Sequence, residues 1–271
     1  SHLVQSTRAG AAYGFALVGV VIRANLLKYP FFEFGPRYAA ATGESLVDGY
    51  RRLGRWALGL FLVVTFGTMF TVLAVVTVVT GSLATQVVGP ALSPAGYSAV
   101  ILAVCALILI PGRYPLLDAL VKVIMVVLTL STVAAVAVAF FGPTRGQSAA
   151  GPSPWNLEAL PFVVALVGWM PSAIDISVWH SLWTLERSRQ TGYRPRLSQV
   201  LFDFNLGYVG TAVLALGFLT LGALVLHGSG VALPESGAAF AAELVRVYTE
   251  LLGGWSRPVI ALAAFTTMFS T

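Results

Sequence analysis

Long apolar runs separated by short polar connections make up most of this chain. They approach or exceed the roughly 20 residues that a helix needs to cross a bilayer. They fall at 11–34, 56–82, 97–111, 115–141, 159–185 and 203–226, and a seventh begins at Pro258. The pattern predicts an all-α polytopic membrane protein with about six full spans and two partial ones. One partial span would be the seventh run, and the other a helix that ends in 1–8 and begins upstream of Ser1.

Composition narrows the class of protein further. Hydrophobic residues make up 57% of the chain and charged residues 10%, and the mean hydropathy is +0.84. Soluble domains carry about 25% charged residues, so a soluble domain is excluded. We expect a single integral membrane domain.

The distribution of arginines predicts the orientation, because positive residues accumulate in short cytoplasmic loops. Arginines are concentrated in the connections 35–55, 112–114 and 186–199, which are therefore predicted to be cytoplasmic, in a multi-pass protein of the cell membrane. The connections 142–159 and 227–257 would face outward. The net charge of +5 is explained by these loops beside anionic lipid, so the lipid bilayer is the expected partner and no nucleic acid is implied.

Motifs for enzymatic chemistry are missing from the sequence. Cys105 is the one cysteine, and the three histidines lie in different segments without metal-ligand spacing. No phosphate-binding glycine loop or nucleophile elbow occurs. The sequence therefore predicts a protein that is not an enzyme and has no resident cofactor.

The most informative run is interrupted in its middle, at 162–179, by Gly168, Pro171 and the acid Asp175. Proline lacks an amide hydrogen and clashes with the carbonyl four residues earlier, here that of Val167. Bilayer hydrocarbon tolerates non-helical backbone only where protein or water satisfies the freed groups. A freed carbonyl beside the thioether of Met170 would suit a cation. The alternative is a kinked helix in which Met170 only fills a gap.

Other polar residues inside the runs have two interpretations each. Arg23 either forms an ion pair with a carboxylate or lies on a transport path. Lys28, in the same run, could extend its ammonium to water only if it lies near the membrane–water interface. Thr68, at three-residue spacing from Thr65 and Thr71, either lines a cavity or bonds back to its own helix. Asp203 either stabilises the start of the 203–226 helix through its dipole or faces the cavity.

Two stretches carry a resemblance to a known family. Val-Gly-Trp-Met-Pro-Ser at 167–172, with His-Ser at 180–181, resembles the sixth-helix pattern of Nramp-type divalent metal transporters, in which Met-Pro-His is followed by His-Ser. The stretch 5–14 is similar to the residues after that family's Asp-Pro-Gly-Asn motif, and 50–54 falls at its connection between the second and third helices.

The resemblance implies a LeuT-type fold with two inverted five-helix repeats and import of manganese or iron, usually with protons. On that map, residues 1–150 form most of the first repeat and 151–271 the start of the second. The resemblance assigns Met170 as a metal ligand through sulfur, Val167 as one through its carbonyl, and His2 to the place of the metal-binding Asn. The family's Asp would lie upstream of Ser1. Gln5 is a candidate cavity residue.

The chain also departs from the family pattern. Ser172 replaces the histidine after the proline, Asp175 has no counterpart, and the 56–82 run lacks the carboxylates that are thought to carry protons. We therefore expect a site that includes Ser172 and Asp175, and no proton relay along 56–82. The remaining ligands suit Mn, Fe, Co or Cd better than Mg or Ca. The alternatives are a LeuT-type carrier of a small organic solute and a membrane sensor or subunit that does not transport.

Overall fold

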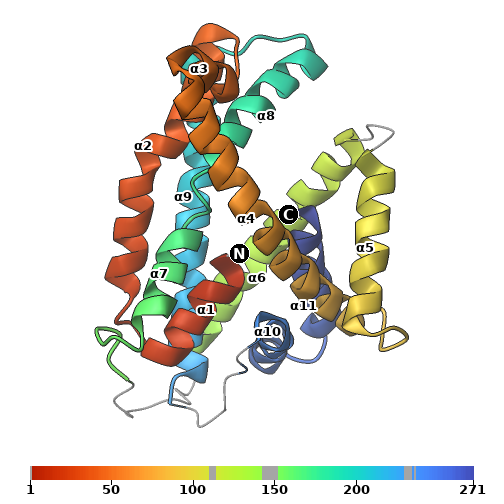
Figure 1. Ribbon diagram of the computed structural model, residues 1–271. Coiled ribbons are helices and arrows are strands. Elements are labelled where there is room, and N and C mark those ends of the chain that lie inside the picture. The colour runs from red at the N-terminus through yellow and green to blue at the C-terminus, as the bar shows by residue number, and fades with distance from the viewer. Residues whose placement is uncertain (1, 110–113, 142–151, 229–233, 235) are drawn as a thin grey trace.

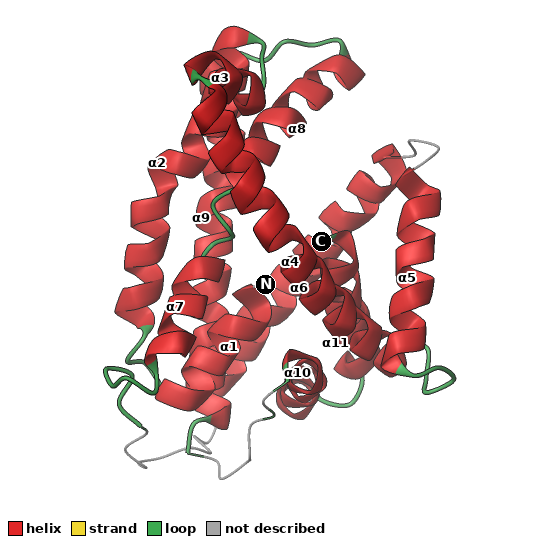
Figure 2. Ribbon diagram, viewed as in Figure 1, coloured by secondary structure: helices red, strands yellow, loops and turns green. Residues whose placement is uncertain are grey.

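The computed structural model describes the chain except for residues 1, 110–113, 142–151, 229–233 and 235. The described residues form helices and no strand (Figure 2), as the apolar periodicity predicted. The elements are α1 (His2–Tyr13), α2 (Val18–Thr42), α3 (Leu46–Leu53), α4 (Arg55–Val87), α5 (Pro94–Leu109), α6 (Tyr114–Phe141), α7 (Leu160–Trp169), α8 (Ile176–Thr191), α9 (Leu197–Leu221), the π-helical turn η1 (Gly222–Leu226), α10 (Gly237–Leu252) and α11 (Ser256–Ser270).

Two of the described helical segments are long and apolar enough to cross a membrane by length and composition. They are α4 and the continuous segment Leu197–Leu226, which joins α9 and η1. Shorter apolar helices account for the other runs. The number of spans and the LeuT-type arrangement stay predictions.

The prediction of a single helix over 11–34 was wrong. Helix α1 ends at Tyr13, Gly14 takes a left-handed conformation with φ of 57°, and α2 begins at Val18. Glycine adopts this conformation without the steric penalty of a Cβ atom. Hydrophobicity runs unbroken through this turn, so hydropathy alone did not reveal it.

Several predicted connections contain helix. Helix α2 continues to Thr42, α3 lies within 35–55, and α8 reaches Thr191. Helix α10 occupies much of 227–257 and buries one face, with Phe240, Leu244 and Tyr248 at four-residue spacing. The glutamates of α10, Glu243 and Glu250, made the segment resemble a loop, although an amphipathic helix carries such charges on its other face.

The helices form two groups around the diagonal helix α4 (Figure 1). Helices α1, α2, α7 and α9 lie on one side, α5 and α11 lie on the other, and α6 crosses behind α4 to join the two groups. Helix α1 packs tightly on the α9–η1 segment. A Cβ atom added to Gly10 would lie 1.9 Å from the Leu219 carbonyl oxygen, and one added to Gly222 would lie 2.1 Å from the Thr7 carbonyl oxygen. Small residues at both positions let the two backbones approach. This contact fixes α1 beside the broken helix.

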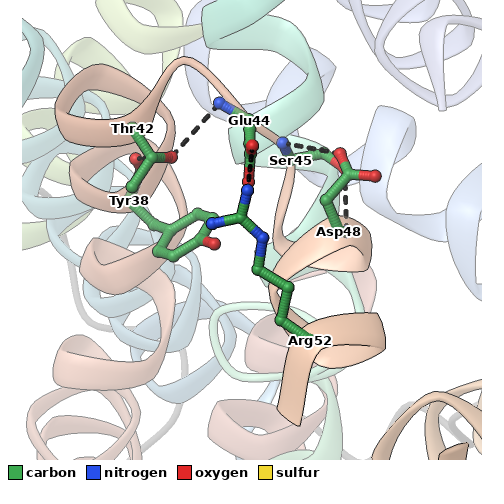
Figure 3. A network of polar contacts seen from close by, with 6 residues as sticks. All are labelled: Tyr38, Thr42, Glu44, Ser45, Asp48 and Arg52. Carbon is green, nitrogen blue, oxygen red and sulfur yellow. Dashed lines mark hydrogen bonds and ion pairs between the residues drawn. The ribbon is translucent and has the colours of Figure 1, made fainter. Parts of the chain in front are cut away.

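A polar network closes the connection between α2 and α3 (Figure 3). The Ser45 hydroxyl accepts a hydrogen bond from the Asp48 amide at 3.3 Å, and Asp48 Oδ2 accepts one from the Ser45 amide at 3.1 Å, which forms a capping box. Hydrogen bonds from Ser45 lower the pKa of Asp48, with smaller contributions from Arg51 and Arg52. Arg52 also forms an ion pair with Glu44. The network fixes the end of α2 that lies away from the α1–α2 turn.

The α2–α3–α4 connection and the α8–α9 connection lie at the same end of the molecule (Figure 1), whereas α10 and the α4–α5 connection lie at the other. Two of the three connections predicted to be cytoplasmic thus share one end, which agrees with the alternation inferred from the arginines. The third, 112–114, falls largely outside the described residues. The assignment of that end to the cytoplasm stays a prediction.

Candidate substrate site at the helix break

The run at 162–179 is broken, as Gly168 and Pro171 predicted. Helix α7 ends at Trp169, Met170 is extended with φ of −102° and ψ of 116°, and α8 begins at Ile176. The Val167 carbonyl loses its bond to position 171 because proline has no amide hydrogen, and it accepts only a 3.3 Å bond from the Met170 amide within its own segment. The break therefore leaves backbone oxygens for a donor from elsewhere.

That donor is the ammonium of Lys28 on α2. Its Nζ donates hydrogen bonds to the carbonyl oxygens of Val167 at 2.6 Å, Gly168 at 2.9 Å and Ser172 at 3.1 Å. An ammonium has three N–H donors, so these contacts use all of them. Oxygens from both sides of the break thus converge on a single positive charge.

Met170 lies fully buried next to these carbonyls, with an exposed fraction of 0%. It belongs to a core cluster with Leu166 of α7 and Leu219 of α9. The Ser6 hydroxyl of α1 donates a weak hydrogen bond to its sulfur at 3.7 Å. The thioether is thereby held at the junction of α1 and the break, where a soft ligand was predicted.

Contacts with α8 and α9 fix α2 and therefore the base of the Lys28 side chain. The Tyr29 hydroxyl donates to Asn205 Oδ1 at 2.6 Å, and the Tyr208 hydroxyl donates to the Asn25 carbonyl at 2.7 Å. A Cβ atom on Gly35 would lie 2.3 Å from the Ser177 carbonyl oxygen, so α2 and α8 are in backbone contact there. Lys28 lies between these anchors.

His180, part of the His-Ser pair in the family resemblance, lies among aromatic rings. Its ring makes edge contacts with Phe32, Trp183 and Phe204 at centroid distances of 5.4 to 5.8 Å. The neighbouring Ser181 hydroxyl accepts a hydrogen bond from the Leu46 amide at 3.0 Å, which joins α8 to α3. In this arrangement the pair supports packing between helices.

The predicted site residues are brought together only in part. Val167, Met170 and Ser172 lie at the break, and the Ser172 carbonyl takes part in the Lys28 contact. Asp175 directly precedes α8, and its carboxylate has no hydrogen bond or ion pair within the described part of the chain. His2 begins α1, but its side chain lies outside what the structure describes.

Of the two interpretations of Arg23, an ion pair and a place on a transport path, the first is not observed and the second stays a prediction. Arg23 is exposed and forms no ion pair among the described residues, while Glu33 of the same helix pairs with Arg37 at 2.6 Å. Lys28 is half-buried, and its ammonium binds carbonyl groups. The sequence could not show which groups Arg23 and Lys28 contact, because it does not show which face of α2 meets the break.

Three further candidates have separate outcomes. The Thr68 hydroxyl bonds back to the Val64 carbonyl at 2.9 Å, which confirms the second of its two interpretations. Asp203 is exposed and lies within α9, which begins at Leu197. At the start of α9, the Gln199 side-chain oxygen accepts a hydrogen bond from the Arg196 amide at 2.9 Å. The Gln5 side-chain oxygen is buried without a hydrogen-bond partner, so it stays a candidate cavity group.

Sequence reasoning missed Lys28 as a site residue. The available signal was a lysine within an apolar run, for which some carbonyl or acidic partner is required. No cluster of three or more His, Cys, Asp or Glu side chains occurs within the described residues. A metal ion bound here would need backbone oxygens and the thioether among its ligands.

A discontinuous helix with open backbone carbonyl oxygens is typical of membrane transporters that bind their substrate between half-helices. The comparison with known families agrees: the profile of the Nramp family, described as natural resistance-associated macrophage protein-like, matches residues 2–271. The chain belongs to the Nramp family. This is a family of integral membrane proteins that transport divalent metal ions, and its members are not enzymes.

The chain is also similar to uncharacterized protein PM0681 of Pasteurella multocida (strain Pm70). The two are 42% identical over 282 aligned residues, which cover 100% of this chain and 63% of the relative. The chain thus spans somewhat less than two thirds of the length of that protein.

Proposed function

We propose that the full-length protein carries divalent transition-metal ions, such as those of Mn, Fe, Co or Cd, across the cell membrane. The observation that supports this most directly is the convergence of the Val167, Gly168 and Ser172 carbonyl oxygens on one cationic group, beside the Met170 thioether. The metal ion is the substrate, and no resident cofactor is proposed.

The ligand types favour soft or borderline divalent ions. A thioether selects against Mg²⁺ and Ca²⁺, which prefer oxygen ligands alone. We assign the sulfur of Met170 and the carbonyl of Val167 as metal ligands, and His2 as a third. Ser172 and Asp175 complete the proposed substrate site.

Proton coupling is not part of this proposal. Helix α4 carries no Asp or Glu from Arg55 to Val87, so it has no carboxylate to relay a proton. We propose that metal moves without protons passing along α4. Arg23, Thr68 and Asp203 are not assigned a coupling role, since Arg23 and Asp203 are exposed and Thr68 bonds to its own helix.

The architecture is proposed from family membership. In a LeuT-type arrangement, residues 1–150 would belong to the first inverted repeat and 151–271 to the second, with α7 and α8 as its discontinuous first helix. The end of the molecule that contains α3 and the α8–α9 connection would face the cytoplasm.

Uptake into proteoliposomes tests the function. The full-length protein is reconstituted, and Mn²⁺ and Cd²⁺ entry is measured with and without an inward proton gradient while the internal pH is recorded. We expect metal entry without a matching change in internal pH. Entry accompanied by protons would refute the uncoupled mechanism, and no entry of any divalent ion would refute metal transport.

Substitution of Met170 tests the site. Met170→Leu keeps most of the side-chain volume and removes the sulfur, so we expect the Kd for Cd²⁺ to rise at least about tenfold, which corresponds to about 1.4 kcal/mol, with little change for Mg²⁺. Isothermal titration calorimetry measures both constants. Met125→Leu on α6 is the matched control and should bind as the unmodified protein does. An unchanged Kd for Cd²⁺ in Met170→Leu would exclude Met170 as a ligand.

A carrier of a small organic cation is the second candidate. The observation that favours it is Asp175, whose carboxylate lacks an ion-pair partner among the described residues and could hold an amine. Amine-dependent flux that is lost in Asp175→Asn, with no metal flux, would favour this candidate over the first.

A further inference from the structure

Lys28 occupies the oxygens that a substrate cation would use. Its Nζ lies 2.6 Å from the Val167 carbonyl oxygen, which is the backbone ligand assigned above to the metal. The ammonium is held by three carbonyls contributed from both sides of the α7–α8 break. A positive charge built into the chain therefore fills the carbonyl face of the proposed substrate site.

The backbone around Lys28 is fixed, so only its side chain is free to move. Asn25 and Tyr29 are tied to α9 by hydrogen bonds of 2.7 and 2.6 Å, and Gly35 is in backbone contact with α8. The four-carbon stem of lysine has several rotatable bonds. The ammonium can thus leave the carbonyls while α2 stays in place.

A metal ion and the Lys28 ammonium exclude one another at this site. A metal bound about 2.2 Å from the Val167 oxygen would lie within about 5 Å of Nζ if Lys28 kept its contact. Like charges repel at that distance, and at this half-buried site solvent screens the repulsion only in part.

We propose that Lys28 is a tethered cation that competes with the transported metal ion for the carbonyl oxygens of the α7–α8 break. The metal binds only when the ammonium leaves, and the ammonium returns when the site empties. Lys28 therefore sets the affinity of the site and keeps the broken backbone satisfied in the absence of substrate. This inference rests on the proposed metal transport.

Binding of Cd²⁺ to the purified full-length protein tests the competition. Lys28→Leu removes the charge without adding a metal ligand, so we expect its Kd for Cd²⁺ to be at least tenfold lower than that of the unmodified protein. Lys28→Arg keeps the charge and should not bind more tightly. Leu27→Met, on the exposed face of the same helix, is the matched control and should leave Kd unchanged.

The outcomes separate this inference from the function on which it rests. If the unmodified protein binds Cd²⁺ and Lys28→Leu binds with the same or a higher Kd, the competition is refuted and metal binding stands. If neither protein binds any divalent ion, both the competition and the proposed function are refuted. Tighter binding by Lys28→Leu together with no gain in Lys28→Arg supports the competition.

A measurement on the unmodified protein covers the case in which Lys28 variants fail to fold. A water-soluble acetylating reagent labels lysine amines, and mass spectrometry follows Lys28 and Lys122, the two lysines of this chain. We expect saturating Cd²⁺ to speed the labelling of Lys28 at least fivefold relative to Lys122, because the amine is released from the carbonyls. An unchanged or slower rate at Lys28 would refute the competition.

Discussion

Helix α2 and the α7–α8 segment both contain proline within an apolar run, yet only one of them breaks. Helix α2 runs without interruption from Val18 to Thr42 through Pro30 and Pro36, whereas the other segment loses its helix after Trp169, next to Pro171. Proline removes one amide hydrogen and displaces one carbonyl in either case.

At the α7–α8 break the structure shows which group receives the freed carbonyls. At the α7–α8 break, Gly168 and Ser172 lie on either side of an extended Met170, and the Lys28 ammonium binds their carbonyl oxygens together with that of Val167. Helix α2 is packed against both α8 and α9 along its length, which favours a continuous helix despite its prolines. At this break, a cation from another helix satisfies the open backbone.

Replacement of the prolines tests this comparison with the largest expected effect. Pro171→Ala restores an amide hydrogen that can bond the Val167 carbonyl, so we expect the rate of Mn²⁺ uptake to fall at least about tenfold, which corresponds to about 1.4 kcal/mol in activation free energy. Uptake into proteoliposomes measures it. The exposed Pro30→Ala in α2 is the control and should keep uptake within about twofold. Equal effects at both prolines would remove the distinction between the two segments.

The contact between α2 and α8 offers a second test. Gly35→Ala would place a Cβ atom 2.3 Å from the Ser177 carbonyl oxygen, so the two helices must separate. We expect a loss of about 1–3 kcal/mol in the free energy of unfolding, as for other overpacked sites. Thermal unfolding in detergent measures it, with Gly19→Ala of the same helix as a control that meets no atom within 4 Å. An unaltered melting temperature for Gly35→Ala would show that the approach of α2 to α8 is not tight.

The smallest expected effect concerns a single hydrogen bond. Tyr208→Phe removes the donor to the Asn25 carbonyl, so we expect a loss of about 1 kcal/mol in the free energy of unfolding. Tyr193→Phe, which removes an exposed bond to Gln199, is the control and should change stability less. If Tyr208→Phe has no effect, that bond does not contribute to holding α2 on α9.

Sequence patterns predicted the helical class and the broken helix well, because both depend on local chemistry. Apolar runs predicted α4, α6 and α9 to within several residues, and the steric properties of Pro171 predicted the freed Val167 carbonyl. The turn at Gly14 and helix α10 were missed. At Gly14 the run stays apolar through a chain reversal, and in α10 the glutamates lie on one face of a helix that buries the other.

Within the candidate site, the sequence by itself determined that a backbone acceptor would open at Val167 and that a thioether would lie beside it, because proline acts on its own helix and Met170 is its neighbour. Only the tertiary structure decided that the Lys28 ammonium occupies this acceptor, and that Arg23 does not. Lys28 lies 139 to 144 positions from its three partners along the chain. Contacts over such distances depend on how α2 packs against α7 and α8, and no local pattern of residues encodes that packing.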